Sequence, residues 1–171
     1  MLVPLFLTSA QEEPHAVFTK RRDDLRRHAG EISFPGGRRD PEDADLAETA
    51  LREAEEEIGL PRQEVSLLWE LPLTSTFVTN YLIHPFVGLI PAGLAWRVSA
   101  EEVEEVLELP LATLRASKTR ARLTRRGISF QTDAFLVDEH LIWGATARIL
   151  ENLLVRLDSA DLSSAARPAE A

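Results

Sequence analysis

The segment that most constrains this chain runs from Asp45 to Gly59, because it carries signals for both ends of one helix. Asp45 is a suitable N-cap, and Glu48 follows three residues later in the pattern of a capping box. Gly59 suits the position just after a helix, and Pro61 prevents continuation. The apolar positions inside the segment recur at helical spacing and form one stripe: Leu46, Ala47, Ala50, Leu51, Ala54 and Ile58. We therefore predict an amphipathic helix that packs against a core along one side.

Three carboxylates crowd the exposed side of this helix. Glu53, Glu56 and Glu57 fall within about 100° of arc, so their negative charges repel one another. A solvated helix more often places Lys or Arg at i+4 from such residues. A hard divalent cation with oxygen ligands would relieve the repulsion, and Mg²⁺ or Mn²⁺ are the first choices. Taken alone, the cluster also fits an acidic surface helix that binds nothing.

The surroundings of the three glutamates favour the metal interpretation. A tight Pro35-Gly36-Gly37 turn precedes the helix, and Arg52 comes directly before Glu53. This arrangement resembles the Nudix box, in which a glycine loop and a following helix carry the metal-binding element REuxEExGu (u aliphatic). The matching residues are Arg52, Glu53, Glu56, Glu57, Gly59 and Leu60, with Ala54 at a position that is usually aliphatic.

The first half of the box departs from the general pattern by one inserted residue. Counting back from Arg52 places the box's first glycine on Arg38 and its lone glutamate on Ala44. Counting forward from Gly37 places Asp43 at the glutamate position instead. We therefore assign no role to Asp43 from the sequence.

A second resemblance lies upstream and narrows the substrate. The stretch from Val17 to Gly37 is similar to the pattern LLTxRSxxLRxHxGxVxFPGG, which marks the coenzyme A pyrophosphatases among Nudix hydrolases. That family commonly carries the same one-residue insertion. Arg22 stands where serine is usual, and Ile32 replaces valine. The matching residues are Thr19, Arg21, Leu25, Arg26, His28, Gly30, Phe34, Pro35, Gly36 and Gly37.

The resemblance implies metal-dependent hydrolysis of the pyrophosphate bond of coenzyme A or its thioesters, giving 3′,5′-ADP and 4′-phosphopantetheine or its acyl form. It implies a catalytic set of Arg52, Glu53, Glu56 and Glu57, in which Glu53 and Glu57 ligate Mg²⁺ or Mn²⁺ and Glu56 joins them directly or through water. The general base stays open between Glu56 and the acidic segment, which offers Glu101, Glu102, Glu104 and Glu105.

Substrate contacts follow from the same match. Arg21, Arg26 and His28 are candidates for binding phosphate oxygens, and Gly36 and Gly37 offer backbone groups near the metal or the phosphates. His28 could instead make a structural hydrogen bond in its loop, and Arg26 could pair with a carboxylate of the metal helix. The step from Ile142 through Trp143 to Gly144 also looks like this family.

Two rival functions remain open at this point. A Nudix hydrolase could act on ADP-ribose or another nucleoside diphosphate derivative, which the match from Thr19 to Gly37 disfavours. A catalytically inactive Nudix-fold module could bind a nucleotide or a protein partner, although such modules usually lose glutamates that this chain retains.

Composition bounds the remaining classes. We expect one domain over residues 1–157 and a flexible tail over 158–171, because the tail is rich in Ser, Ala and Pro. The chain has no cysteine, so it has no disulfide framework or thiolate ligand, and we expect a cytoplasmic protein. A net charge of −9 argues against a general nucleic-acid binder, although residues 111–132 hold six Lys/Arg and no acidic residue. No apolar run approaches the roughly 20 residues of a membrane span.

The fold implied by the resemblance is the Nudix fold, an α/β (α+β) architecture with a mixed β-sheet sandwiched between helices. The oligomeric state is open between a monomer and a homodimer, and we expect the native chain to begin with a short extension before Met1. Alternation and turn residues predict a short acidic helix over Ser99–Leu107, a polar turn over Ser9–His15, a second amphipathic helix over Gly144–Leu157, and strands over Leu2–Thr8, Ala16–Thr19, Glu31–Phe34, Val65–Trp69, Phe77–Val78, Tyr81–Ile90, Ile128–Phe130 and Ala134–Val137.

Overall fold

A six-stranded mixed sheet forms the centre of the protein in this computed structural model, which describes residues 1–8, 13–24, 30–76, 81–125 and 127–159. The strand order is β3-β2-β1-β7-β4, and β8 pairs with the other side of β2. Only the pairing of β1 with β7 is parallel among the described ladders of this sheet. The strands are β1 (Leu2–Leu7), β2 (Pro14–Arg21), β3 (Ile32–Ser33), β4 (Ser66–Glu70), β7 (Phe86–Leu89) and β8 (Val103–Pro110).

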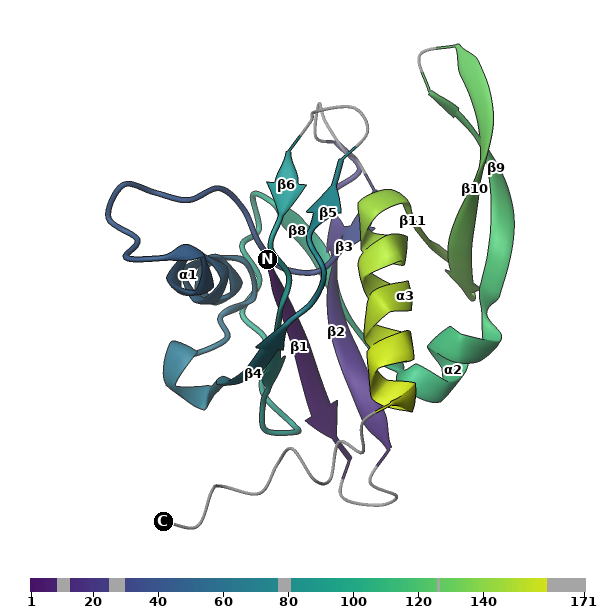
Figure 1. The fold of residues 1–171 in the computed structure, drawn as a ribbon. Helices are drawn as coiled ribbons and strands as arrows, with labels where there is room; N and C mark the ends of the chain where they lie inside the picture. Colours follow the sequence, from purple (N-terminus) through teal and green to yellow (C-terminus); the bar gives the residue numbers. More distant parts are fainter. Residues whose placement is uncertain (9–12, 25–29, 77–80, 126, 160–171) are drawn as a thin grey trace.

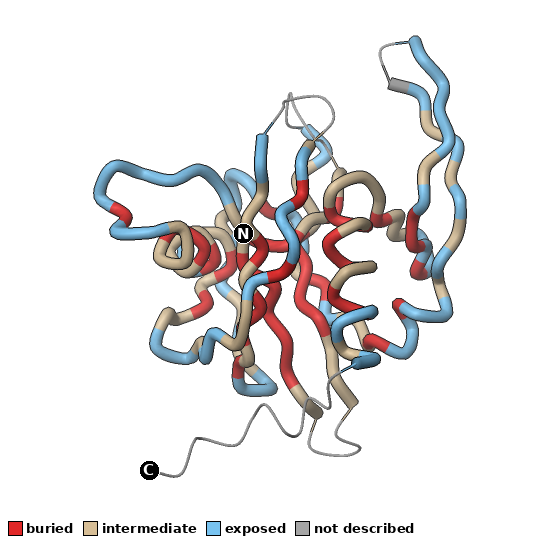
Figure 2. The backbone as a smooth tube through the Cα atoms, viewed as in Figure 1, coloured by how far each residue is buried: buried red, intermediate tan, exposed pale blue. Residues whose placement is uncertain are grey.

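Helices cover both faces of this sheet (Figure 1). The helix α1 (Leu46–Ile58) packs on one face, where Ala50, Ala54 and Ile58 meet Leu2 and Val17. The helices α2 (Leu111–Ala116) and α3 (Gly144–Asp158) pack on the other face. Buried residues follow this layering, since they concentrate in the central strands and on the inner sides of the helices (Figure 2). The expected mixed sheet between helices is confirmed.

Two smaller sheets accompany the central sheet. A three-stranded sheet is formed by β9 (Lys118–Arg125), β10 (Ile128–Val137) and β11 (His140–Trp143), and its β9–β10 hairpin projects beyond the body (Figure 1). A two-stranded sheet pairs β5 (Thr74–Ser75) with β6 (Leu82–Ile83). The 3₁₀ turn η1 (Arg62–Glu64) links α1 to β4. Among the described residues, no helix is both long enough and apolar enough to cross a membrane.

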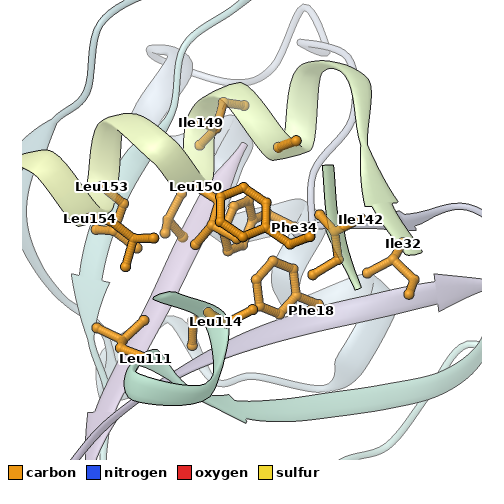
Figure 3. Close-up of a cluster of buried hydrophobic side chains, with 14 of the residues drawn as sticks. Phe18, Ile32, Phe34, Leu111, Leu114, Ile142, Ile149, Leu150, Leu153 and Leu154 are labelled. Atoms are coloured by element: carbon orange, nitrogen blue, oxygen red, sulfur yellow. The ribbon is translucent and has the colours of Figure 1, made fainter. Parts of the chain in front are cut away.

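The larger core cluster lies on the α3 face of the sheet. Phe18 of β2 and Phe34, which follows β3, are fully buried and stack with their ring centroids 4.4 Å apart. Ile149 and Leu150 of α3 cover these rings (Figure 3). This packing holds the end of β3 in place, and Phe34 leads directly into the Pro35-Gly36-Gly37 turn.

The expected acidic helix over Ser99–Leu107 is wrong. Ser99 does start a turn, because its carbonyl accepts hydrogen bonds from the backbone N–H groups of Glu102 and Val103. From Val103 onward, however, the chain is the strand β8, which pairs with β2 along almost its whole length. Backbone pairing with a neighbouring strand thus outweighs the local capping pattern, since the apolar Val103 and Leu107 also become buried against the sheet.

Other boundaries differ in detail. The strand expected over Tyr81–Ile90 divides into β6 and β7, because His84 and Pro85 interrupt it and proline has no backbone N–H for the ladder. The expected turn over Ser9–His15 is shorter, since β2 already begins at Pro14. Strand β9 and helix α2 were not predicted. The strand expected over Phe77–Val78 and nearly all of the expected flexible tail, residues 160–171, lie outside the described residues.

We expect Phe18→Ala to lower the free energy of unfolding by about 3–5 kcal/mol, because it removes a ring from a filled core and leaves a cavity. Urea unfolding followed by circular dichroism measures the change. Val155→Ala, at a residue on α3 that is 65% exposed, is the control and should stay within about 0.5 kcal/mol of the parent. A loss below 1 kcal/mol for Phe18→Ala would contradict this account of the core.

Candidate active site

Helix α1 begins and ends at the residues that the sequence predicts. The side chain of Asp45 accepts a hydrogen bond from the backbone N–H of Glu48 at 2.8 Å. The Glu48 carboxylate in turn accepts from the backbone N–H of Ala44 at 2.7 Å. Gly59 ends the helix with φ at 68°, a left-handed conformation that glycine adopts without steric cost. These caps fix the position of the glutamates along the helix.

The Gly36-Gly37 turn lies directly against two of those glutamates. The backbone N–H of Gly36 donates to Oε2 of Glu57 at 3.2 Å. A Cβ atom at Gly37 would lie only 2.4 Å from the carboxylate carbon and oxygens of Glu53, so any side chain there would displace this group. The second glycine of the turn is therefore required by the close approach of the backbone to Glu53.

The environments of the three glutamates differ. Burial raises the pKa of Glu57 to about 8, against the hydrogen bond from Gly36, and the charges of Glu53 and Glu102 raise it further. Burial also raises the pKa of Glu53, whose side chain is 16% exposed, while Arg52 opposes the shift. Glu56, by contrast, is exposed and pairs with Arg52 at 3.0 Å. Two carboxylates are thus held partly out of water, and the charge of Glu53 disfavours ionisation of Glu57.

This donor set fits a hard divalent cation. A cation between Glu53 and Glu57 would offset both the burial and the mutual repulsion, and oxygen ligands are those that Mg²⁺ and Mn²⁺ prefer. Within the described part of the chain, no group of three or more His, Asp or Glu side chains converges in a way that could hold a metal.

Arg52 connects this helix to the preceding loop. Its Nε and Nη2 donate to the two carboxylate oxygens of Asp43 at 2.9 and 3.0 Å, and Nη2 also donates to the carbonyl of Arg38 at 2.9 Å. The same guanidinium lies 3.1 Å from Glu53. A planar fork of donors suits this arrangement, because it bonds both oxygens of one carboxylate and still reaches neighbours.

Asp43 is the residue to which the sequence assigned no role. It is 5% exposed, and it also accepts hydrogen bonds from the Thr49 hydroxyl at 2.8 Å and the Asp40 backbone N–H at 2.9 Å. The bond from Arg52 holds the pKa of Asp43 well below its usual range, and burial opposes this shift only in part. Counting forward from Gly37 was the signal that pointed to this position.

The acidic segment that leads into β8 and includes its first residues reaches the site through Glu102. Glu102 lies 3.4 Å from Nη1 of Arg21, and the charges of both residues act on the pKa of Glu57. Glu104 instead pairs with Lys20 at 3.0 Å. Glu101 is an exposed turn residue before β8, and Glu105 lies on β8 opposite Lys20 of β2. Among the predicted substrate residues, Arg21, Gly36 and Gly37 therefore lie at the site, while Arg26 and His28 lie outside the described residues.

The Asp43–Arg52 pair predicts a specific dependence of stability on pH. Because the folded pKa of Asp43 is lowered, its stabilising contribution is present above the unfolded pKa of about 3.9 and is lost as pH falls toward the folded value. We therefore expect Asp43→Asn to lower the melting temperature at pH 7 and to differ progressively less from the parent below pH 4. A difference that is constant between pH 7 and pH 3 would contradict the ionic character of the pair.

Comparisons with known proteins agree with this geometry. A family model described as the NUDIX domain matches residues 3–128. The chain is 40% identical over 156 residues to the uncharacterized Nudix hydrolase NudL of Photorhabdus laumondii, covering 90% of this chain and 81% of the relative. The NudL protein of Yersinia enterocolitica is 38% identical over 156 residues, covering 90% and 77%.

Solved structures show the same fold at lower identity. A MutT/nudix family protein from Enterococcus faecalis superposes with a TM-score of 0.62 at 13% identity, covering 92% of this chain and 60% of that protein. An Ap4A hydrolase of C. elegans in a binary complex superposes with a TM-score of 0.58 at 14% identity, covering 95% and 96%. With its glutamate helix, its glycine turn and these relatives, the chain belongs to the Nudix hydrolase family, whose members cleave phosphoric anhydride bonds.

Proposed function

We propose that this protein is a coenzyme A pyrophosphatase, which hydrolyses coenzyme A or its thioesters to 3′,5′-ADP and 4′-phosphopantetheine or its acyl form. The observation that carries the proposal is the convergence of Arg21 and the Gly36-Gly37 turn on Glu53 and Glu57. Arg21 and both glycines belong to the segment that resembles the coenzyme A pyrophosphatases. The substrate-specifying segment and the metal-binding helix therefore meet at one place.

Glu53 and Glu57 would hold Mg²⁺ or Mn²⁺, and Glu56 would join them directly or through water. When bound, the cation neutralises the diphosphate oxygens and lowers the pKa of a coordinated water. The chain's own residues supply the positioning. Gly36 holds the Glu57 carboxylate through its backbone N–H, and Arg52 holds the Glu53 carboxylate and the loop carbonyl of Arg38.

Arg21 is placed to bind the diphosphate. Its pair with Glu102 is long, at 3.4 Å, and both side chains are more than a third exposed. Exposed pairs of this kind contribute about 1 kcal/mol or less, so an anionic substrate can displace the carboxylate from the guanidinium. Such a displacement would leave Glu102 unpaired beside the glutamates of α1. Glu102 is therefore the member of the acidic segment that we propose as general base.

The decisive test is product analysis after incubation with coenzyme A and Mg²⁺ or Mn²⁺, with ADP-ribose in a parallel reaction and a chelator control. We expect chelator-sensitive formation of 3′,5′-ADP from coenzyme A, much faster than cleavage of ADP-ribose. Rapid cleavage of ADP-ribose with intact coenzyme A would retain the metal helix and reject the proposed substrate. Nucleotide binding without turnover of either compound would favour an inactive binding module.

We expect Glu53→Gln and Glu57→Gln each to lower turnover of coenzyme A by at least about a hundredfold, beyond the typical loss when a residue behind a metal ligand is changed. Each substitution removes a charge that would hold the cation, while keeping the shape of the side chain. Steady-state kinetics at saturating Mg²⁺ measures the effect, with circular dichroism to confirm folding.

Glu55→Gln is the matched control for these variants. Glu55 is a neighbouring glutamate on α1 that pairs with Arg62 at 2.7 Å instead of facing the glycine turn. Its substitution should leave turnover within about twofold of the parent, since surface changes of this kind have small effects. Equal losses for Glu55→Gln and Glu57→Gln would show that the helix matters only as an acidic surface.

A further inference from the structure

A cavity of about 300 Å³ lies between the end of β2 and the strand β11. Its lining includes Lys20, Glu31, Ile32, His140, Leu141 and Trp143. Lys20 directly precedes Arg21 at the end of β2, where the pairing with β8 shifts register. Arg21 acts on Glu57 on the α1 face, whereas Lys20 lines the cavity on the other face. The cavity and the glutamates of α1 therefore lie on opposite faces of the sheet, near the same end of β2.

The fold presents a flat aromatic group to this cavity. Trp143 ends β11 and occupies the position before the first residue of α3, where its backbone is extended. Phe130 of β10 lies against it, with the ring centroids 6.4 Å apart. The indole is thus fixed between a strand ladder and a helix start. Aromatic rings of this kind form stacking platforms for nucleobases regardless of base identity.

Charged groups accompany the indole. Lys20 brings an ammonium group that Glu104 holds at 3.0 Å, and His140 brings an imidazole from β11. Glu31 and Glu139 add carboxylates, which can accept hydrogen bonds from an exocyclic amino group. An aromatic plane with an ammonium group, an imidazole and carboxylate acceptors suits a phosphorylated purine nucleoside better than the uncharged amide chain of pantetheine.

The size of the cavity supports the same choice. Pockets that enclose a drug-sized ligand span about 300–1,000 Å³, so this cavity lies at the small end of the range. It suits one end of a coenzyme A molecule and is too small for the whole. The pantetheine end would lie outside this cavity.

We propose that this cavity binds the 3′-phosphoadenosine end of the substrate, with the purine against Trp143 and the 3′-phosphate beside Lys20 and His140. The proposal rests on the proposed function, because that function supplies a substrate with this end. It assigns to Lys20 the discrimination between coenzyme A and its 3′-dephospho form. It also gives the Ile142-Trp143-Gly144 step a role in binding.

Binding without turnover tests the proposal directly. In a Trp69→Phe/Trp96→Phe background, Trp143 is the last of the three tryptophans and reports by fluorescence. We expect 3′,5′-ADP to quench it without metal and 5′-AMP to bind more weakly. Lys20→Met should weaken binding of 3′,5′-ADP about tenfold and leave binding of 5′-AMP unchanged, as expected when one point-charge contact to phosphate is removed. Absence of quenching by either nucleotide would overturn the proposal.

Calorimetry on the protein with all three tryptophans measures the binding affinity for each nucleotide independently of the double substitution. Trp143→Leu should weaken binding of 3′,5′-ADP and of 5′-AMP by the same factor, because both nucleotides lose the stacking surface. Lys118→Met is the matched control. Lys118 also pairs with a glutamate, Glu151, but it is the first residue of β9 and does not line the cavity. Equal weakening by Lys20→Met and Lys118→Met would show a general charge effect and reject the assignment.

Kinetics separates the proposal from the function on which it rests. Lys20→Met should lower kcat/KM for coenzyme A about tenfold and leave kcat/KM for 3′-dephospho-coenzyme A unchanged. An equal loss for both substrates would reject the role of Lys20. A parent protein that leaves coenzyme A intact, yet binds 3′,5′-ADP through Trp143 and Lys20, would overturn the proposed function and retain the cavity as a nucleotide site.

Discussion

The contact between Arg52 and Asp43 joins the two segments on which the candidate active site depends. Asp43 belongs to the loop after the glycine turn, and Arg52 belongs to the middle of α1. With the further bond to the Arg38 carbonyl, the guanidinium fixes the distance between turn and helix. Gly37 can approach Glu53 closely only while that distance is kept. The position of the Arg52 guanidinium thus determines where a bound metal ion would lie.

Arg52 does not neutralise the glutamates equally. It contacts Glu53 and Glu56, whereas Glu57 has the backbone N–H of Gly36 as its polar partner and the distant charge of Arg21. This explains why burial dominates at Glu57 and raises its pKa furthest. The most strongly disfavoured negative charge stands deepest under the glycine turn. A divalent ion bound there would interact most favourably with Glu57, because Glu57 is the glutamate whose ionised form the protein stabilises least.

Local features were predictable from the sequence, and long-range features were not. The caps of α1 depend on residues a few positions apart, so Asp45, Glu48 and Gly59 could be identified before the structure. Glu53, Glu56 and Glu57 could be grouped by helical spacing alone. The segment from Val103 to Leu107 was mistaken for a helix, because its conformation is set by pairing with β2, far away in the chain. Lys20 and Trp143 line one cavity because β3, which pairs with β2, contacts β11. This contact joins distant parts of the chain, so the local sequence around each residue does not predict it.

The place of β1 in the sheet has a consequence for how the protein folds. Leu2–Leu7 is the first described strand, yet it lies in the middle of the sheet, between β2 and its parallel partner β7. Pairing of Leu2 with Phe86 requires the whole segment between them, about half of the 171 residues, to have been synthesised. Contacts of such sequence separation form slowly, because a long loop must close before they add stability. During synthesis, this apolar strand therefore leaves the ribosome before the other described strands of the sheet and acquires its second neighbour late, so it needs protection from other chains meanwhile.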